Sequence, residues 1–197
     1  MEEYQIEPDV SGACYFYAMA AIIGGRALVK NIHKNSMQGD IKFIEALEKM
    51  GALTHESPEG LILESDGKLK GIEIDLSNFS DQSMTLAVVA PFANGKTFIK
   101  NIGHIRGQES DRIRATINEL RKLDIECEEL EDGMIIYPLS MDKERKNIHI
   151  DTYNDHRIAM SFAVLGTKLD GIIIDNPMCC KKTFENFFDI IEKLTNI

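Results

Sequence analysis

The chain has few of the features that mark secreted, metal-binding or membrane-spanning proteins. Its four cysteines include one neighbouring pair, Cys179 and Cys180, and no Cys-x-x-Cys spacing occurs, so zinc and disulfide frameworks find little support. No apolar run reaches the ~20 residues that a bilayer span requires. The acidic start Met1-Glu2-Glu3 lacks the basic and then apolar pattern of a signal peptide. We therefore expect a soluble, cytoplasmic protein with no membrane contact.

Basic residues are also scarce. The chain has 22 Lys and Arg against 32 Asp and Glu, which gives a net charge of −10. A nucleic-acid-binding protein needs a basic face that displaces counterions from phosphates, so we expect no nucleic-acid partner. Any bound anion must be held by a local arrangement, for which helix amino termini are natural candidates.

The chain has 197 residues, 44% of them apolar, enough for one domain or one large lobe with its own core. Within this length a segment repeats. Residues 25–32 (Gly-x-x-Leu-Val-Lys-Asn-Ile) recur as residues 95–102 (Gly-x-x-Phe-Ile-Lys-Asn-Ile), and residues 171–176 are a weaker third copy. Self-similarity of this kind indicates a fold made of repeated units.

Each strand-like copy lies between two predicted helices. The first helices, residues 11–23, 83–93 and 156–165, each follow an aspartate (Asp9, Asp81, Asp155) and are apolar on most sides, which predicts burial. The second helices have apolar spacings of 3 or 4: Ile44, Leu47, Met50; Ile113, Ile117, Leu120; Phe184, Phe188, Ile191. Their openings carry the capping types Asp40, Ser110 and Thr183.

Further strands are predicted at residues 60–64 and 133–137, and residues 66–78 and 140–151 are interpreted as a strand with polar turns. The predicted fold class is therefore α/β (α+β), a pseudo-threefold repeat of β-α-β-α-β-β units over about residues 1–75, 76–150 and 151–197. The first helix of each unit should lie inside, and the second outside.

Unusual polar residues collect at the turns that lead into these helices. Arg112, Arg157 and Lys182 supply three cations, a set that suits a small, multiply charged anion such as a phosphorylated carboxylate. The ordinary alternative is that each cation pairs on the surface with Asp111, Asp155 or Glu185. Because repeated units present equivalent turns on the same side, we expect the cations to converge in a concave, positive patch.

Two carboxylates, Asp81 and Glu109, belong to the same turns and could divide the roles of base and acid in a proton transfer. The alternatives are a helix cap for Asp81 and a surface charge for Glu109. His104 and His156 also lie in these turns, where a lone histidine is more often a structural hydrogen-bond donor than a catalyst.

One signature and five further ordered blocks carry a resemblance to the 5-enolpyruvylshikimate-3-phosphate (EPSP) synthase family. Residues 153–160, Tyr-Asn-Asp-His-Arg-Ile-Ala-Met, resemble the family's Tyr-x-Asp-His-Arg-Met-Ala-Met signature. The other blocks are residues 7–16, 35–40, 81–85, 109–112 and 182–184, of which the short ones read Asp-x-x-Met-Thr, Glu-Ser-Asp-Arg and Lys-Thr-Phe. The resemblance spans nearly the whole chain and matches the family's carboxy-terminal half.

The resemblance implies an inside-out α/β barrel and transfer of the enolpyruvyl group of phosphoenolpyruvate to the 5-hydroxyl of shikimate 3-phosphate, with release of phosphate and no cofactor or metal. It implies that Asp81 is the proton acceptor for the hydroxyl and a ligand of shikimate 3-phosphate, and that Glu109 serves proton transfer at the methylene carbon. Arg112, Arg157 and Lys182 match the phosphoenolpyruvate clamp.

Two departures from the family pattern are visible. His104 and Gln108 stand where the family commonly places asparagine and lysine in contact with shikimate 3-phosphate, so this contact loses a charge. The amino-terminal lobe and a short strand that it lends to this half also have no counterpart, so Met1 is interpreted as the start of a fragment, and the isolated chain is expected to be inactive. A UDP-amino-sugar enolpyruvyl transferase lobe and a non-catalytic ligand-binding domain remain as alternatives.

Overall fold

The computed structural model describes residues 6–140 and 144–195. The α-helices are α1 (Val10–Ile23), α2 (Lys42–Met50), α3 (Ser83–Val89), α4 (Arg112–Lys122), α5 (His156–Gly166) and α6 (Phe187–Thr195), and the 3-10 helices are η1 (Gly39–Ile41), η2 (Ser80–Gln82), η3 (Ala90–Phe92), η4 (Gly103–Gly107) and η5 (Pro177–Lys182). The strands are β1 (Gly25–Lys30), β2 (Leu53–Ser57), β3 (Gly60–Ser65), β4 (Leu69–Lys70), β5 (Glu73–Asp75), β6 (Ala93–Asn94), β7 (Thr97–Lys100), β8 (Cys127–Leu130), β9 (Gly133–Ile136), β10 (Ile148–Ile150) and β11 (Ile172–Ile174).

The element order repeats, as the sequence predicts. The middle repeat runs β5-α3-β7-α4-β8-β9, the first runs α1-β1-α2-β2-β3, and the last runs β10-α5-β11-α6. Strands that flank an inner helix pair in parallel, β5 with β7 and β10 with β11, whereas β8 and β9 form an antiparallel hairpin. In the middle repeat the sheet order is β5-β7-β9-β8, and in the first it is β1-β3-β2, so β1 lies at the end of its sheet.

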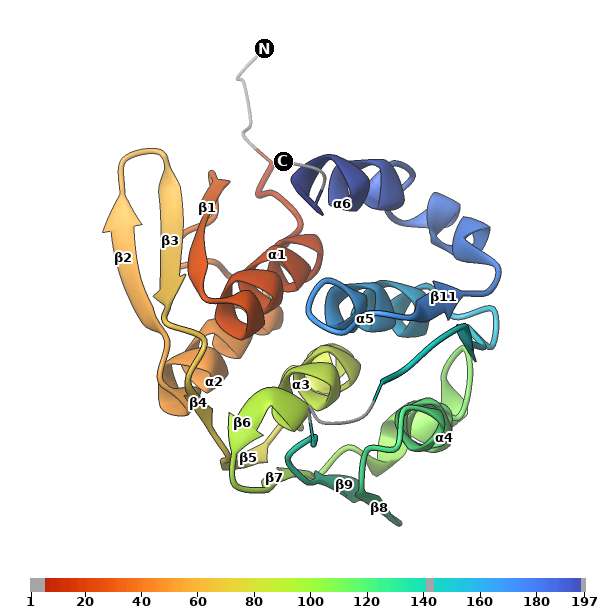
Figure 1. Ribbon diagram of the computed structural model, residues 1–197. Coiled ribbons are helices and arrows are strands. Elements are labelled where there is room, and N and C mark those ends of the chain that lie inside the picture. The colour runs from red at the N-terminus through yellow and green to blue at the C-terminus, as the bar shows by residue number, and fades with distance from the viewer. Residues whose placement is uncertain (1–5, 141–143, 196–197) are drawn as a thin grey trace.

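The three inner helices α1, α3 and α5 pack against one another in the centre of the molecule, and the sheets and the remaining helices lie around them (Figure 1). All seven residues of α3 are buried, as are most of α1 and α5. This confirms the predicted inner helices. α3 ends at Val89, earlier than the predicted residue 93, because Pro91 lacks the N–H group that would continue the helix and the chain tightens into η3.

Two of the outer helices follow their predicted apolar faces. Ile44, Leu47 and Met50 of α2 are buried, as are the apolar residues of α4, and their charged residues mostly face outward. The third begins at Phe187, later than predicted. The backbone N–H groups of Thr183 and Phe184 both donate to the carbonyl of Cys180, so Thr183 closes η5 and does not cap α6.

Two other predicted helix caps are also wrong. Asp111, and not Ser110, caps α4 by accepting a bond from the backbone N–H of Arg114. Asp40 belongs to η1, which runs directly into α2, and its carboxylate accepts bonds from Ser11 and Gln82 instead. The carboxylate of Asp40 therefore joins η1 to α1 and η2.

The asparagines that end the repeated strands share one backbone conformation. Asn31 and Asn101 both have φ of 60°, and Asn176 has φ of 48°. Asparagine tolerates the left-handed region better than most residues, which explains why the same residue type recurs where the chain leaves the strand. The three turns therefore redirect the chain in the same way toward the segments that carry charged residues.

Two predicted extended segments resolve into short strands. Residues 66–78 contain β4 and β5. Residues 140–151 contain β10, although residues 141–143, like residues 1–5, lie outside the described part of the chain. Within the described ranges, none of the helices combines the length and the apolar character that crossing a membrane would demand.

Candidate active site

Asp81 joins two arginines from different repeats. It lies in η2, directly before α3, and its two carboxylate oxygens accept bonds from Arg112 (Nη1, 3.1 Å) and Arg157 (Nη2, 2.7 Å). Asp81 is not a helix cap, because α3 follows η2 without a side-chain cap. The side chains of the two arginines are 4% and 13% exposed, so their positions are fixed by packing as well as by charge.

Asp155 holds Arg112, one of the two arginines that bind Asp81, from the start of α5. It caps α5 by accepting a bond from the backbone N–H of Arg157 (2.9 Å), and its other oxygen accepts from Nε of Arg112 (2.7 Å) and from the hydroxyl of Ser110 (3.1 Å). Burial of Asp155 by itself would raise the pKa of its carboxyl group, but the Arg112 guanidinium and the other donors outweigh burial and lower this pKa below its usual value.

A second group of ions forms around Glu109, in the turn before α4. One carboxylate oxygen lies 2.6 Å from Nζ of Lys182, and the other lies 3.0 Å from Nδ1 of His156. Partial burial opposes ionisation of Glu109, but Lys182 and His156 outweigh it and lower the pKa of Glu109. Burial also lowers the pKa of His156, only partly offset by Glu109, so His156 is neutral near pH 7 and Lys182 supplies the positive charge.

The five predicted residues are therefore brought together, in two halves that meet at Asp155 and His156. Asp155 Oδ1 and His156 Nδ1 are 3.9 Å apart. We call Arg112, Arg157, Asp81 and Asp155 the guanidinium half, and Lys182, Glu109 and His156 the ammonium half.

The observed ion pairs correct two expectations. Arg157 pairs with Asp81, and Lys182 pairs with Glu109, so the surface pairs considered for the three cations do not describe this cluster, although Asp155 does bind Arg112. The three cations face three carboxylates, so the cluster is formally neutral and does not form the positive patch that the sequence predicts. Lys182 also lies at the end of η5 and not directly before a helix.

The two residues that depart from the family pattern lie at the rim of the guanidinium half. Gln108 accepts a hydrogen bond from Nη1 of Arg112, and Nε2 of His104 lies 2.8 Å from the hydroxyl of Ser80, the neighbour of Asp81. Both side chains are thus close enough to Asp81 to take part in the same site.

Glu109, Asp155 and His156 each offer one atom that could bind a metal, and these atoms lie within 4.8 Å of one another. Both carboxylates already have a cationic partner, Lys182 or Arg112. A divalent cation would have to displace these side chains or overcome their repulsion, so the arrangement favours an ion-pair cluster over a metal site.

A hollow of about 250 Å³ lies between the amino-terminal ends of α1 and α5, lined by Ser11, Tyr15, His156 and Arg157, among others. The buried hydroxyl of Tyr15 faces Arg157, which lowers the pKa that burial of this hydroxyl otherwise raises strongly. Sequence reasoning missed Tyr15 and the anchoring role of Asp155. The sequence pointed to Asp155 only as a residue before a helix, as a possible surface partner and as part of the residue 153–160 signature. It pointed to Tyr15 only as part of the block of residues 7–16.

Comparison with known proteins gives a consistent result. The model of the family EPSP synthase (3-phosphoshikimate 1-carboxyvinyltransferase) matches residues 1–191. The 3-phosphoshikimate 1-carboxyvinyltransferase of Trichormus variabilis is 44% identical over 94% of this chain and 42% of its own length, and that of Vibrio vulnificus is 43% identical over 99% and 45%. The solved EPSP synthase of Acinetobacter baumannii superposes with a TM-score of 0.81 at 29% identity, over 96% of this chain and 46% of that one. The chain thus spans less than half the length of these relatives.

Proposed function

Since the chain belongs to the EPSP synthase family, we propose that it is the carboxy-terminal lobe of a 3-phosphoshikimate 1-carboxyvinyltransferase. In this proposal the complete enzyme transfers the enolpyruvyl group of phosphoenolpyruvate to the 5-hydroxyl of shikimate 3-phosphate and releases phosphate, in the biosynthesis of aromatic amino acids in the cytoplasm. The observation that carries the proposal is the convergence of Asp81, Glu109, Arg112, Arg157 and Lys182 in one cluster.

The cations have the properties that a clamp for phosphoenolpyruvate requires. The nearly buried guanidiniums of Arg112 and Arg157 are held side by side on Asp81, and planar guanidiniums bind carboxylates and phosphates through paired hydrogen bonds. Lys182, whose side chain is 55% exposed, is free to follow a phosphate. Substrate anions would thus take over contacts that the carboxylates of the cluster make in the free protein.

This exchange would also prepare the acid and the base. Asp81 is assigned as the acceptor of the hydroxyl proton and Glu109 as the group that serves the methylene carbon. The lowered pKa of Glu109 depends on Lys182, so Glu109 is ionised in the free protein. When Lys182 turns to a substrate phosphate, Glu109 loses its cationic partner, its pKa rises, and it becomes able to hold the proton that the methylene carbon receives.

In this proposal shikimate 3-phosphate binds beside Asp81, and His104 and Gln108 lie at the edge of its site. Because Gln108 is uncharged and its side-chain oxygen accepts a bond from Arg112, it contributes hydrogen bonding and no positive charge. The phosphate of this substrate must therefore be neutralised largely by residues outside this lobe. We assign that task to the absent amino-terminal lobe.

The first repeat lacks, among the described residues, a strand that its neighbour has, and this supports a missing segment. Its strand β1 lies at a sheet end, whereas its counterpart β7 has a parallel partner in β5. An apolar groove of about 560 Å³ runs beside β1, between α1 and α6, with Phe16, Met19 and Leu194 in its lining. We place a short strand from the amino-terminal part of the complete protein against this edge, as the family pattern implies.

The proposal is tested by a turnover assay with phosphoenolpyruvate and shikimate 3-phosphate, in which phosphate release is measured. The chain is assayed alone and with the separately purified amino-terminal lobe of the Trichormus variabilis relative. We expect no turnover by the chain alone, because half of the binding groups are absent, and turnover when the lobe is added. Repeated turnover by the chain alone, or a stable two-lobe complex without turnover, contradicts the proposal. A complex active only on a UDP-amino sugar would identify the related transferase.

A further inference from the structure

Helix α4 contacts the segment before α5 at two points, one inside the candidate site and one outside it. Arg112, at the start of α4, binds Asp155, and Glu119, seven residues later, binds the residues that precede Asp155. Seven residues are about two helical turns, or roughly 10 Å, so both side chains project from the same face of α4.

Glu119 is fully buried, although it carries a carboxylate. One of its oxygens accepts a bond from the hydroxyl of Tyr153 (2.9 Å), and the other accepts from the backbone N–H of Asp151 (3.0 Å) and lies 2.6 Å from Nζ of Lys122. A buried carboxylate requires such partners. Glu119 can therefore stay buried at low cost only while its bonds to residues 151 and 153 are kept.

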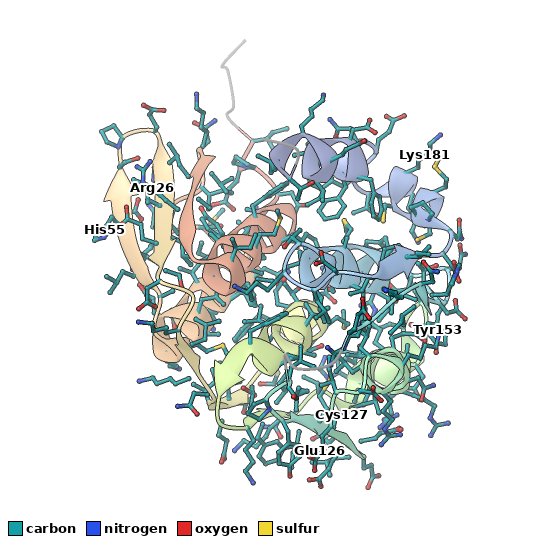
Figure 2. The ribbon with its side chains drawn as sticks, in the orientation of Figure 1. Arg26, His55, Glu126, Cys127, Tyr153 and Lys181 are labelled. Atoms are coloured by element: carbon teal, nitrogen blue, oxygen red, sulfur yellow. The ribbon has the colours of Figure 1, made fainter. Side chains whose placement is uncertain are left out.

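This segment has an uncommon backbone. Tyr153 and Asn154 are consecutive residues with φ of 51° and 55°, in the left-handed region that costs most side chains roughly 1–2 kcal/mol each. Such a turn persists only where its surroundings hold it. It leads directly into Asp155, which caps α5 and binds Arg112. Figure 2 shows Tyr153 beside α4.

We propose that Glu119 and Tyr153 are positioning residues for the reaction: their hydrogen bond holds the left-handed turn, so that Asp155 fixes the orientation of the Arg112 guanidinium. Neither residue belongs to the cluster of substrate-binding groups, and their effect is transmitted through Asp155. The link to the reaction rests on the proposed function, whereas the control of Arg112 by Tyr153 is a property of this chain and is measured on it alone.

The test is the exchange of the Nε proton of Arg112 with solvent, followed by NMR on chain labelled with ¹⁵N-arginine. In Tyr153→Phe the ring stays and only the hydroxyl is lost. Nε of Arg145 donates to the carbonyl of Leu123 at 2.8 Å and serves as an internal reference, because a general loss of stability accelerates exchange at both arginines.

Tyr137→Phe is the matched control, since the hydroxyl of Tyr137 also donates to a carboxylate, that of Glu128, on the exposed surface. We expect Tyr153→Phe to raise the exchange rate of Arg112 relative to that of Arg145 about tenfold, as loss of one hydrogen bond to a buried charge implies, and Tyr137→Phe to leave this ratio unchanged.

An unchanged ratio in Tyr153→Phe, or an equal rise in Tyr137→Phe, overturns the proposal. If Tyr153→Phe does not fold, Glu119→Leu, which removes both acceptor oxygens, is measured in the same way, and its ratio decides the proposal. Because the readout requires neither substrate nor the second lobe, an unchanged ratio leaves the proposed activity standing. If the ratio rises but the two-lobe complex is inactive, the proposed activity is wrong and the positioning of Arg112 by Tyr153 stands.

Discussion

The two halves of the cluster are built differently. In the guanidinium half, Arg112 is 4% exposed, binds the fully buried Asp155, and shares Asp81 with Arg157. In the ammonium half, the 55% exposed Lys182 extends from the end of η5 to Glu109. Buried charges depend on their partners, whereas exposed ion pairs contribute little to stability. The comparison indicates a rigid, buried group of arginines beside an exposed ion pair that can rearrange more easily.

The largest effect on stability is expected from Arg112→Ala. This change leaves the carboxylate of Asp155 buried without its main cation, which costs about 3–5 kcal/mol of the free energy of unfolding. Urea denaturation of the chain measures the loss. A loss below about 1 kcal/mol would show that the ion pairs of the guanidinium half contribute no more to stability than those of the ammonium half.

Arg157→Ala is expected to affect substrate binding most directly. In the two-lobe enzyme it should weaken phosphoenolpyruvate binding by about 1.5–3 kcal/mol, since a charge-assisted contact is removed. Isothermal calorimetry gives the affinity. Arg114→Ala is the control, because the 64% exposed side chain of Arg114 pairs with Glu129 outside the cluster. Equal affinities for the two variants would remove Arg157 from the clamp.

His156 of the ammonium half should make the stability of the chain depend on pH. Its pKa in the folded chain lies below the ordinary value of 6.5 because it is buried. The unfolded chain therefore binds more protons just below pH 6.5, so stability is complete above that pH and falls as the pH decreases toward the folded pKa. His156→Gln should flatten this part of the curve. Denaturation midpoints between pH 5 and 7.5 test it, and an unchanged slope contradicts a buried, neutral His156.

The smallest effect is expected from Lys182→Met. The side chain of Lys182 is 55% exposed, so loss of its pair with Glu109 should change the unfolding free energy by less than about 1 kcal/mol. The pKa of Glu109 should nevertheless rise, because its principal cationic partner is lost. Carboxyl ¹³C NMR follows the titration of Glu109. An unchanged pKa of Glu109 would mean that Lys182 is not what lowers it.

The repeats explain why so much of the fold could be predicted. Apolar spacing and the repeat of residues 25–32 as residues 95–102 indicated the inner helices and the central strands, because burial and repetition both leave local traces in the sequence. The start of α6 was wrong, since Thr183 is of the capping type but its backbone N–H is used to close η5. The formal neutrality of the cluster was missed because Asp155 was considered only as a surface partner, and Asp81 and Glu109 were not considered as partners of the cations.

The site residues were predicted by type and place, but their partners were not. Repetition placed Asp81 and Arg112 at corresponding turns, yet their contact joins residues 31 positions apart and depends on how the inner helices pack. Tyr153 shows the same limit. Its position before Asp155 was visible in the sequence, whereas its hydrogen bond to Glu119, 34 positions away, arises only when α4 and the segment before α5 come together.

The central claim, that one cluster divides clamping from proton transfer, is tested most directly by the steady-state kinetics of Asp81→Ala in the two-lobe enzyme. Asp81 is assigned to proton transfer, so turnover should fall by about 10²–10⁴-fold while KM for phosphoenolpyruvate changes much less. Turnover that remains at the level of the unaltered enzyme would contradict the account.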